Sequence, residues 1–157
     1  MNKFTTTMAF ATLSISSLFP SASVAADDAK HIPGIFIGAT HIESETEFTF
    51  GFEYEYKLDA QWGVGAVFER TNDGAHSDGV AVGLAALYYH PIKNVRLGAG
   101  IGEERIGGAH PHDETLYRLS ASYDFHVAEF GLAPTIAVDF IDNEEAIVFG
   151  VAVTRPF

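Results

Sequence analysis

Two imidazoles and two carboxylates lie within five residues in the stretch "GGAHPHDE", residues 107–114. Imidazole and carboxylate together suit Zn²⁺, Cu²⁺ or Ni²⁺. A related stretch, "FERTNDGAHSDG", precedes "EERIGGAHPHDE" by about 35 residues and brings a further histidine. The candidate metal ligands are therefore His76, His110, His112 and Asp113.

Other observations argue against a metal site. Gly, Pro, Asp and His are ordinary turn residues, and duplication of one hairpin also explains the similarity of the two stretches. A stable site needs three or four ligands with supporting partners. The chain has no cysteine, which excludes thiolate ligands and thiolate catalysis. We predict no metal and no cofactor, and keep metal binding by these loops as an alternative.

The composition fits a single folded domain. The chain has 157 residues, of which 47% are hydrophobic, and a formal net charge of −12. A protein that binds nucleic acid needs a basic stripe, and none is visible. We therefore expect no nucleic-acid partner.

The N-terminus has the pattern of a secretory signal peptide. Lys3 precedes the apolar run "MAFATLSISSLF", and the small residues Ser23, Val24 and Ala25 follow. The run is too short and too rich in Ser and Thr to span a membrane as a helix. We predict a cleaved signal peptide over 1–25, a short periplasmic segment over 26–32 and a barrel over 33–157.

The rest of the chain alternates with a period of two. In "FTFGFEYEYKL", Phe50, Phe52 and Tyr54 share one face, and Gly51, Glu53 and Glu55 share the other, as in a β-strand. Alternation predicts eight strands, over 34–41, 48–58, 62–69, 80–88, 95–102, 117–125, 130–140 and 147–157.

The connections between these strands differ at the two ends. "LDAQ", "HPIKN" and "FHVAE" are tight turns, whereas "HIESETE", "RTNDGAHSDG", "RIGGAHPHDE" and "IDNEE" are more polar and mostly longer. Short turns at one end and longer loops at the other are typical of an outer-membrane barrel. The predicted fold class is all-β, an eight-stranded antiparallel up-and-down transmembrane β-barrel.

A soluble barrel of the lipocalin sort has its apolar faces inside. Here the more polar faces consist largely of Gly, Ala and Ser, which suit the narrow interior of an eight-stranded barrel. We therefore expect the larger apolar faces to meet lipid, including Val82, Leu84 and Tyr88 in the strand 80–88. Two girdles of aromatic residues follow, one with Tyr56, Trp62, Tyr88, Phe125, Phe130 and Phe157, the other with Phe48, Phe68, Tyr117, Phe140 and Phe149.

The signal peptide, "YKLDAQWGVGAVFE" and the final strand "IVFGVAVTRPF" resemble the small eight-stranded outer-membrane barrels of Gram-negative bacteria, the OmpA-barrel and OmpX type. The resemblance implies an outer-membrane location and partners among outer-membrane lipid and lipopolysaccharide. It also implies recognition by the barrel-assembly machinery through the strand ending at Phe157. Arg155 departs from the usual apolar residue near the end. We expect a monomer.

Charged residues in the barrel interior must be paired. The inward-facing set is predicted to be Glu53, Glu55, Arg96, Glu104, Arg118, Asp124 and Asp139. Keeping inward faces opposite one another across "GGAHPH" predicts Arg96 opposite Asp124 and Gly102 opposite Arg118. It also predicts Arg118 among Glu53, Glu69, Glu104 and Asp139.

Eight strands leave no aqueous channel, so we expect a structural, envelope-integrity or interaction role without an open pore. The alternative is an enzyme that modifies lipid A, for which Ser120, Ser122 and His126 are the candidates. A nucleophile needs its base within hydrogen-bond reach, and His126 falls at a tight turn, so we predict no catalytic residues. The short loops disfavour a broad adhesive surface. Their acids suit the divalent cations that bridge lipopolysaccharide, namely Glu43, Glu45, Glu47, Asp142, Glu144 and Glu145.

Overall fold

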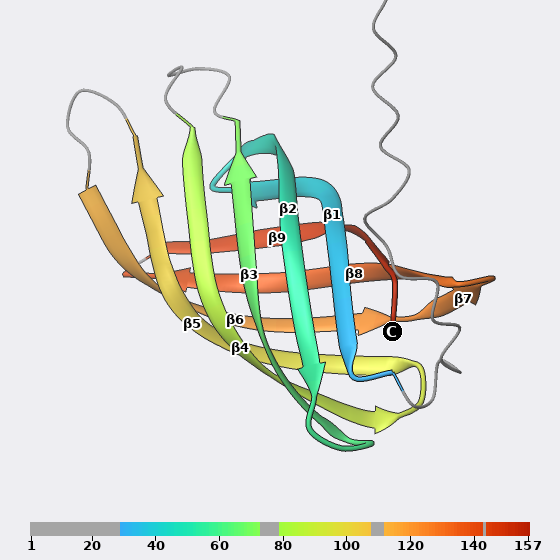
Figure 1. Ribbon diagram of the computed structural model, residues 1–157. Helices are drawn as coiled ribbons and strands as arrows, with labels where there is room; N and C mark the ends of the chain where they lie inside the picture. The colour runs from blue at the N-terminus through green and yellow to red at the C-terminus, as the bar shows by residue number, and fades with distance from the viewer. Residues whose placement is uncertain (1–28, 73–78, 108–111, 143) are drawn as a thin grey trace, which may run out of the picture.

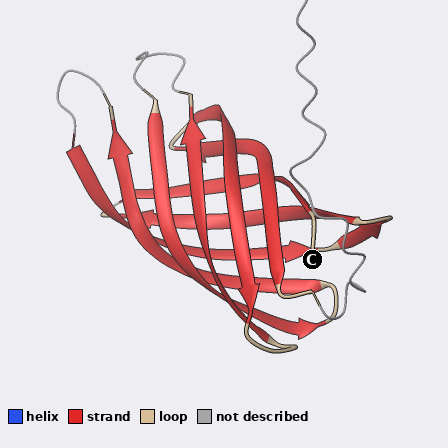
Figure 2. Cartoon of the chain, viewed as in Figure 1, coloured by secondary structure: helices blue, strands red, loops and turns tan. Residues whose placement is uncertain are grey.

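The computed structural model describes residues 29–72, 79–107, 112–142 and 144–157, and its regular structure is entirely β (Figure 2). In this part of the chain, no helix is long and apolar enough to cross a membrane. The strands are β1 (His31–Ile42), β2 (Glu45–Lys57), β3 (Trp62–Thr71), β4 (Val80–Ile92), β5 (Val95–Ile106), β6 (His112–Tyr123), β7 (Phe125–Val127), β8 (Phe130–Ile141) and β9 (Glu144–Thr154).

The strands form a closed antiparallel barrel (Figure 1). Closure comes from β1 pairing with β9 and from β6 pairing with β8, where Ser122 lies opposite Thr135. β7 continues the same register on β8, with Phe125 opposite Leu132. β6 and β7 are thus one strand interrupted at Asp124, and the predicted eight-stranded up-and-down barrel is confirmed.

The barrel begins slightly earlier than predicted. His31 and Ile32, which the sequence assigned to a segment before the barrel, belong to β1 and pair with Tyr56 and Glu55 of β2. Hydrogen bonds to the C-terminal residue hold the start of β1 in place. The His31 amide donates to the Phe157 carbonyl and the Phe157 amide donates to the His31 carbonyl, both at 2.9 Å. The predicted signal peptide, 1–25, lies outside the described residues.

The two ends of the barrel differ. The turn end carries the connections 58–61, 93–94 and 128–129, together with residue 29 and the C-terminus; the loop end carries 43–44, 72–79, 107–111 and 142–143. Asp59 shapes the turn 58–61, since its Oδ1 accepts hydrogen bonds from the amides of Gln61 (2.7 Å) and Trp62 (2.8 Å). In Figure 1 the turns gather at the lower right, and the strand ends of the loop end lie at the top and left.

Side chains alternate across the wall as predicted for most strands. On β2, Phe52 is 52% exposed on the outside, whereas Glu55 is 1% exposed inside. The outer surface is therefore broadly apolar, as a lipid-facing wall requires. Its large outward side chains include Ile35, Ile37, Phe48, Phe50, Phe68, Leu97, Ile101, Tyr117, Leu119, Phe125, Ile136, Ile147, Phe149 and Val151.

The predicted orientation of β4 is wrong. Val82, Leu84 and Tyr88 point inward and are buried, whereas Leu87 is 46% exposed on the outside. Both faces of this strand are apolar, so alternation shows which residues share a face but not where that face points. Tyr88 consequently does not belong to the aromatic girdle at the turn end.

Neighbouring glycines explain why Tyr88 fits inside. Its register partners are Gly63 on β3 and Gly98 on β5. A Cβ atom added to Gly98 would lie 3.2 Å from the tyrosine ring, and one added to Gly65 would lie 2.9 Å from it. The ring fills the space that these glycines leave, as close packing of the interior requires.

The orientation of β4 can be tested with single cysteines, because the chain has none of its own. A spin label on Gly83→Cys is expected to collide readily with lipid-dissolved oxygen, since a Cβ atom there meets nothing within 4 Å. The same label on Leu84→Cys is expected to be shielded. Electron paramagnetic resonance in bilayers measures both, and the reverse ranking would contradict the inward placement of Leu84.

Candidate functional site: the charged barrel interior

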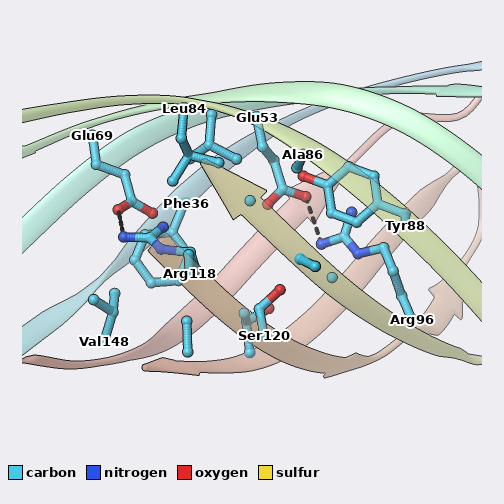
Figure 3. Close-up of a pocket in the computed structure, with 16 residues that line it drawn as sticks. Phe36, Glu53, Glu69, Leu84, Ala86, Tyr88, Arg96, Arg118, Ser120 and Val148 are labelled. Carbon is cyan, nitrogen blue, oxygen red and sulfur yellow. Dashed lines mark hydrogen bonds and ion pairs between the residues drawn. The ribbon is translucent and has the colours of Figure 1, made fainter. Parts of the chain in front are cut away.

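An ion-pair cluster toward the loop end joins three strands. The guanidinium of Arg118 on β6 makes two parallel bonds to Asp139 on β8, with both N–O distances at 2.6 Å. Its Nη2 also lies 2.7 Å from Glu69 Oε2 on β3, across the interior. All three side chains are buried, so the two acids hold one cation away from bulk solvent. Figure 3 shows the pair of Arg118 and Glu69. Bidentate pairing of this kind is strong and geometrically specific.

A second cluster lies toward the turn end. Arg96 on β5 reaches across to β2, where its Nη2 lies 2.9 Å from Glu53 Oε1 and its Nη1 lies 3.5 Å from Glu55 Oε2. Its Nε donates to Ser122 Oγ at 3.1 Å, and its guanidinium lies 5.0 Å from the centre of the Tyr88 ring. These contacts hold Arg96 from several sides and give each guanidinium nitrogen a hydrogen-bond partner.

His90 completes this cluster and was missed by the sequence analysis. Its Nε2 lies 2.6 Å from Glu55 Oε1, and the residue is only 5% exposed. The sequence pattern predicts His90 in the turn "HPIKN", but β4 extends to Ile92. Continuing the alternation by two residues would have placed His90 on the same face as Tyr88, which the structure shows to point inward.

The predicted register between β5 and β6 is wrong by two residues. Arg96 lies opposite Ser122 and Gly100 lies opposite Arg118. A shift of two residues preserves the inward faces, so alternation could not detect it. Asp124 instead interrupts the strand at the turn end, where its amide donates to the Asn94 carbonyl at 2.8 Å. The partners of Arg96 are therefore Glu53 and Glu55 rather than Asp124.

The remaining members of the predicted interior network are less enclosed. Glu104 on β5 lies opposite Glu114 near the loop end, and Asp124 lies at the turn end; both are partly exposed. Glu53, which was expected near Arg118, pairs with Arg96 instead.

Little free space lies between the two clusters. An interior cavity bounded by both arginines and by Phe36 and Leu84 has a volume of about 30 Å³, room for about two water molecules. Within the described residues, every buried side-chain nitrogen and oxygen has a hydrogen-bond partner. An apolar cluster adjoins Arg118 toward the loop end, formed by Val67, Val82, Leu84, Leu116, Ile141 and Ala146.

Of the four candidate metal ligands, the described residues include the side chain of Asp113 alone. Asp113 accepts a hydrogen bond from Arg105 Nε at 2.8 Å on the exposed loop end. His76, His110 and the side chain of His112 lie outside the described residues. Among the residues that are described, no three metal-binding side chains form a group. Metal binding by these loops stays the untested alternative to the prediction of no metal.

Two of the residues considered for lipid A chemistry, Ser122 and His126, lie in different surroundings. Ser122 accepts a hydrogen bond from Arg96, and His126 on β7 is exposed at the turn end. The interior is built to bind charged side chains to one another. A closed wall, apolar outside and filled with ion pairs inside, defines a transmembrane β-barrel of the small eight-stranded type.

Solved structures similar to this chain include small eight-stranded outer-membrane β-barrels. Ail, the attachment invasion locus protein of Yersinia pestis, matches with a TM-score of 0.57 and 14% identity, over 82% of this chain and 99% of Ail. The N-terminal barrel of Pseudomonas aeruginosa OprF gives 0.60 and 14%, over 83% and 100%. Neisserial surface protein A gives 0.55 and 11%, over 81% and 96%.

No protein-family model matches the chain, and no curated sequence is significantly similar to it. Identities this low show a shared fold and leave the activity to be argued from the chain itself.

Proposed function

We propose that the protein is a monomeric outer-membrane barrel with a structural, envelope-integrity or interaction role, and that it forms no open pore and catalyses no reaction. The observation that carries this proposal is the filled interior. Arg118 and Arg96 each form an ion pair with an acid on the opposite wall, so these side chains cross the lumen. The cavity between them has room for about two waters. A diffusive pore needs a continuous aqueous path, and eight strands are too few to provide one.

The orientation follows from the two ends. In outer-membrane barrels the short turns and the termini lie in the periplasm, and the longer loops face outward. The turn end is therefore periplasmic, and the segment 1–25 is a signal peptide that is removed on export. The last strand, β9, pairs with β1 and leads to Phe157, which supports recognition by the barrel-assembly machinery of a Gram-negative cell.

The loop end supports a modest interaction surface. Two of its connections are only two residues long, 43–44 and 142–143, which leaves little room for a broad adhesive face. Its acids include Glu43, Glu45, Glu103, Asp113, Glu144 and Glu145. Carboxylates at this level suit the divalent cations that bridge lipopolysaccharide.

Two measurements on the purified protein test the absence of a pore. The unboiled barrel is expected to migrate differently from the boiled chain on a gel, which shows that it has folded. Folded protein in planar bilayers is then expected to give no conductance steps above the lipid background, because both ion-pair clusters obstruct the lumen. Steady single-channel currents from heat-modifiable protein would contradict the proposal. A deletion strain profiled for permeability, lipid A composition and metal sensitivity separates the envelope role from the two alternatives.

A further inference from the structure

The outer wall of the barrel is recessed over β4, toward the loop end. A cavity there has a volume of about 470 Å³. Its lining includes Gly83 and Ala85 on β4, Ile101 and Glu103 on β5, and Thr115 on β6. All five residues are exposed. We call this recess the outer notch; it lies on the opposite side of the wall from the filled lumen.

The notch is a consequence of the orientation of β4. Because this strand places its larger side chains in the lumen, its outward positions near the loop end hold only Ala81, Gly83 and Ala85. A Cβ atom added to Gly83 would meet nothing within 4 Å. Other strands cover the same wall with large apolar side chains, such as Phe50 on β2. The wall is therefore locally thin where β4 meets the membrane.

The shape of the notch favours a lipid chain. Phe68 on β3 is the register partner of Gly83, and Ile101 on β5 is the partner of Ala85; both flanking side chains are 54% exposed. Neighbouring strands are about 4.8 Å apart, so β3 and β5 stand about 10 Å apart. A linear acyl chain fits a recess of this width, whereas the convex wall of a second barrel does not enter it. The notch is also continuous with the lipid-facing wall, and a recess left unfilled would forfeit packing contacts.

Two polar side chains border the notch on its loop-end side. Glu103 and Thr115 are register partners on β5 and β6, and Glu103 is also the partner of Gly83. A carboxylate on the lipid-facing side of a barrel is costly unless hydrogen-bond donors reach it. Arg105 lies close enough to sense the charge of Glu103, but its Nε and Nη2 donate to Asp113. A lipid head with hydroxyl or amide donors would stabilise Glu103.

The charges around the notch balance. The two rows of outward register partners nearest the loop end run from β3 to β6 and contain two cations and two carboxylates, Arg70, Arg105, Glu103 and Asp113. A balanced surface gives no preference for an anionic head, because complementary potential is what selects charge. It suits a head that both donates and accepts hydrogen bonds, as a sugar does.

The notch lies at the depth of lipid headgroups. Phe68 and Tyr117 point outward beside it and are 54% and 55% exposed. Tyr117 is the register partner of Ile101. Aromatic side chains of a membrane barrel gather where the acyl chains meet the headgroups. One lipid can therefore place its chain in the notch and its head beside Glu103.

We propose that the outer notch binds a glycolipid of the leaflet at the loop end. One acyl chain lies over Gly83 and Ala85, and hydroxyl or amide groups of the sugar head bond to Glu103 and Thr115. The proposal names a lipid partner for the interaction role given above and rests on that role. Binding is measured on purified protein in detergent, so it is independent of the location and of the absence of a pore, which the gel and conductance measurements test separately.

The test titrates lipid A into the folded protein in a neutral detergent and counts bound lipids by native mass spectrometry. Gly83→Leu fills the notch, and the open space at Gly83 accepts the larger side chain without a clash. This variant is expected to bind lipid A about tenfold or more weakly, equivalent to ~1.4 kcal/mol. Glu103→Ala/Thr115→Val removes the contacts to the head and is expected to lose a similar factor. Its weaker binding of phosphatidylglycerol is expected to stay as in the wild type.

Two control variants match these changes elsewhere on the outer wall. Ala121→Leu adds bulk to the outward face of β6 nearer the turn end, and Glu145→Ala removes an exposed acid from β9 at the loop end. Both are expected to bind lipid A like the wild type. Unboiled gel mobility checks the folding of each variant, and the single variants Glu103→Ala and Thr115→Val replace the double variant if it does not fold.

The choice of lipid separates recognition of the sugar from attraction of phosphate. Monophosphoryl lipid A is expected to bind as tightly as the diphosphoryl form, and phosphatidylglycerol and phosphatidylethanolamine are expected to bind more weakly than either. The proposal would be overturned by undetectable lipid A binding, by unchanged affinity in Gly83→Leu or in the polar variant, or by an equal loss in the controls. Phosphatidylglycerol or phosphatidylethanolamine binding as tightly as lipid A, or a requirement for the second phosphate, would overturn it equally.

Discussion

Replacing Arg118 by methionine is expected to lower the free energy of unfolding by roughly 3–5 kcal/mol, because removal of one partner leaves uncompensated buried charge. Arg118 is 7% exposed and is the shared counterion of Asp139 and Glu69. Without it, two carboxylates face each other in a low-dielectric interior, and one must take up a proton or draw in water. Urea titration of the refolded protein in detergent micelles or bilayers measures the change.

Two controls separate loss of the ion pair from loss of packing. The triple variant Arg118→Met/Asp139→Asn/Glu69→Gln removes both acids with the cation and is expected to recover much of the stability. Arg105→Met breaks the Arg105–Asp113 pair, in which both side chains are largely exposed. Exposed pairs contribute little, so this variant is expected to unfold almost as the wild type does. If Arg118→Met were as stable as Arg105→Met, the interior cluster would not be the structural element described here.

The alternation of side chains was readable from sequence because the outer wall contacts a uniform environment. Phe50 and Phe52 face outward and Glu53 and Glu55 face inward, as the period of two predicts. Any one-residue slip would bury the aromatic rings in a narrow lumen and expose the acids to lipid. The composition of β2 therefore determines both the strand and its orientation.

The same reasoning fails for β4, whose two faces are both apolar. Its orientation depends on the fit of the Tyr88 ring against glycines of the two neighbouring strands, Gly65 on β3 and Gly98 on β5. That fit depends on three strands together, so it cannot be predicted from the residues of one strand alone. Comparing side-chain volumes across predicted strand pairs, large against small, is the signal that could have found it.

The ion-pair partners of the buried arginines could not be predicted from the pattern of single strands either. Arg96 bonds to residues 41 and 43 positions away in sequence, across the lumen on β2. Only the closed barrel brings β5 and β2 face to face. A long arginine side chain can then reach any of several acids at a similar depth in the lumen. The set of inward charges followed from alternation, whereas their pairing required the three-dimensional register.

A double-mutant cycle on Arg96 distinguishes the observed partners from the predicted one. Arg96→Gln alone is expected to cost roughly 3–5 kcal/mol if Glu53 and Glu55 stay ionised. Combined with Glu53→Gln, the loss is expected to be less than additive, with a coupling energy of about 0.5–3 kcal/mol, because Arg96 Nη2 lies 2.9 Å from Glu53 Oε1. Combined with Asp124→Asn, the coupling energy is expected to be smaller, because Arg96 makes its ion pairs with Glu53 and Glu55 instead.

The ranking of the two couplings is the decisive quantity. Asp124 lies beyond the end of β6, and Arg96 makes its ion pairs with Glu53 and Glu55. Removing the Asp124 carboxylate is therefore expected to affect Arg96 less than removing the Glu53 carboxylate does. The register predicted from sequence, with Arg96 opposite Asp124, gives the opposite ranking. Unfolding free energies of the wild type, the three single variants and the two double variants, all in one detergent, decide between them. A larger coupling with Asp124 than with Glu53 would show that β5 and β6 pair two residues away from the register described here.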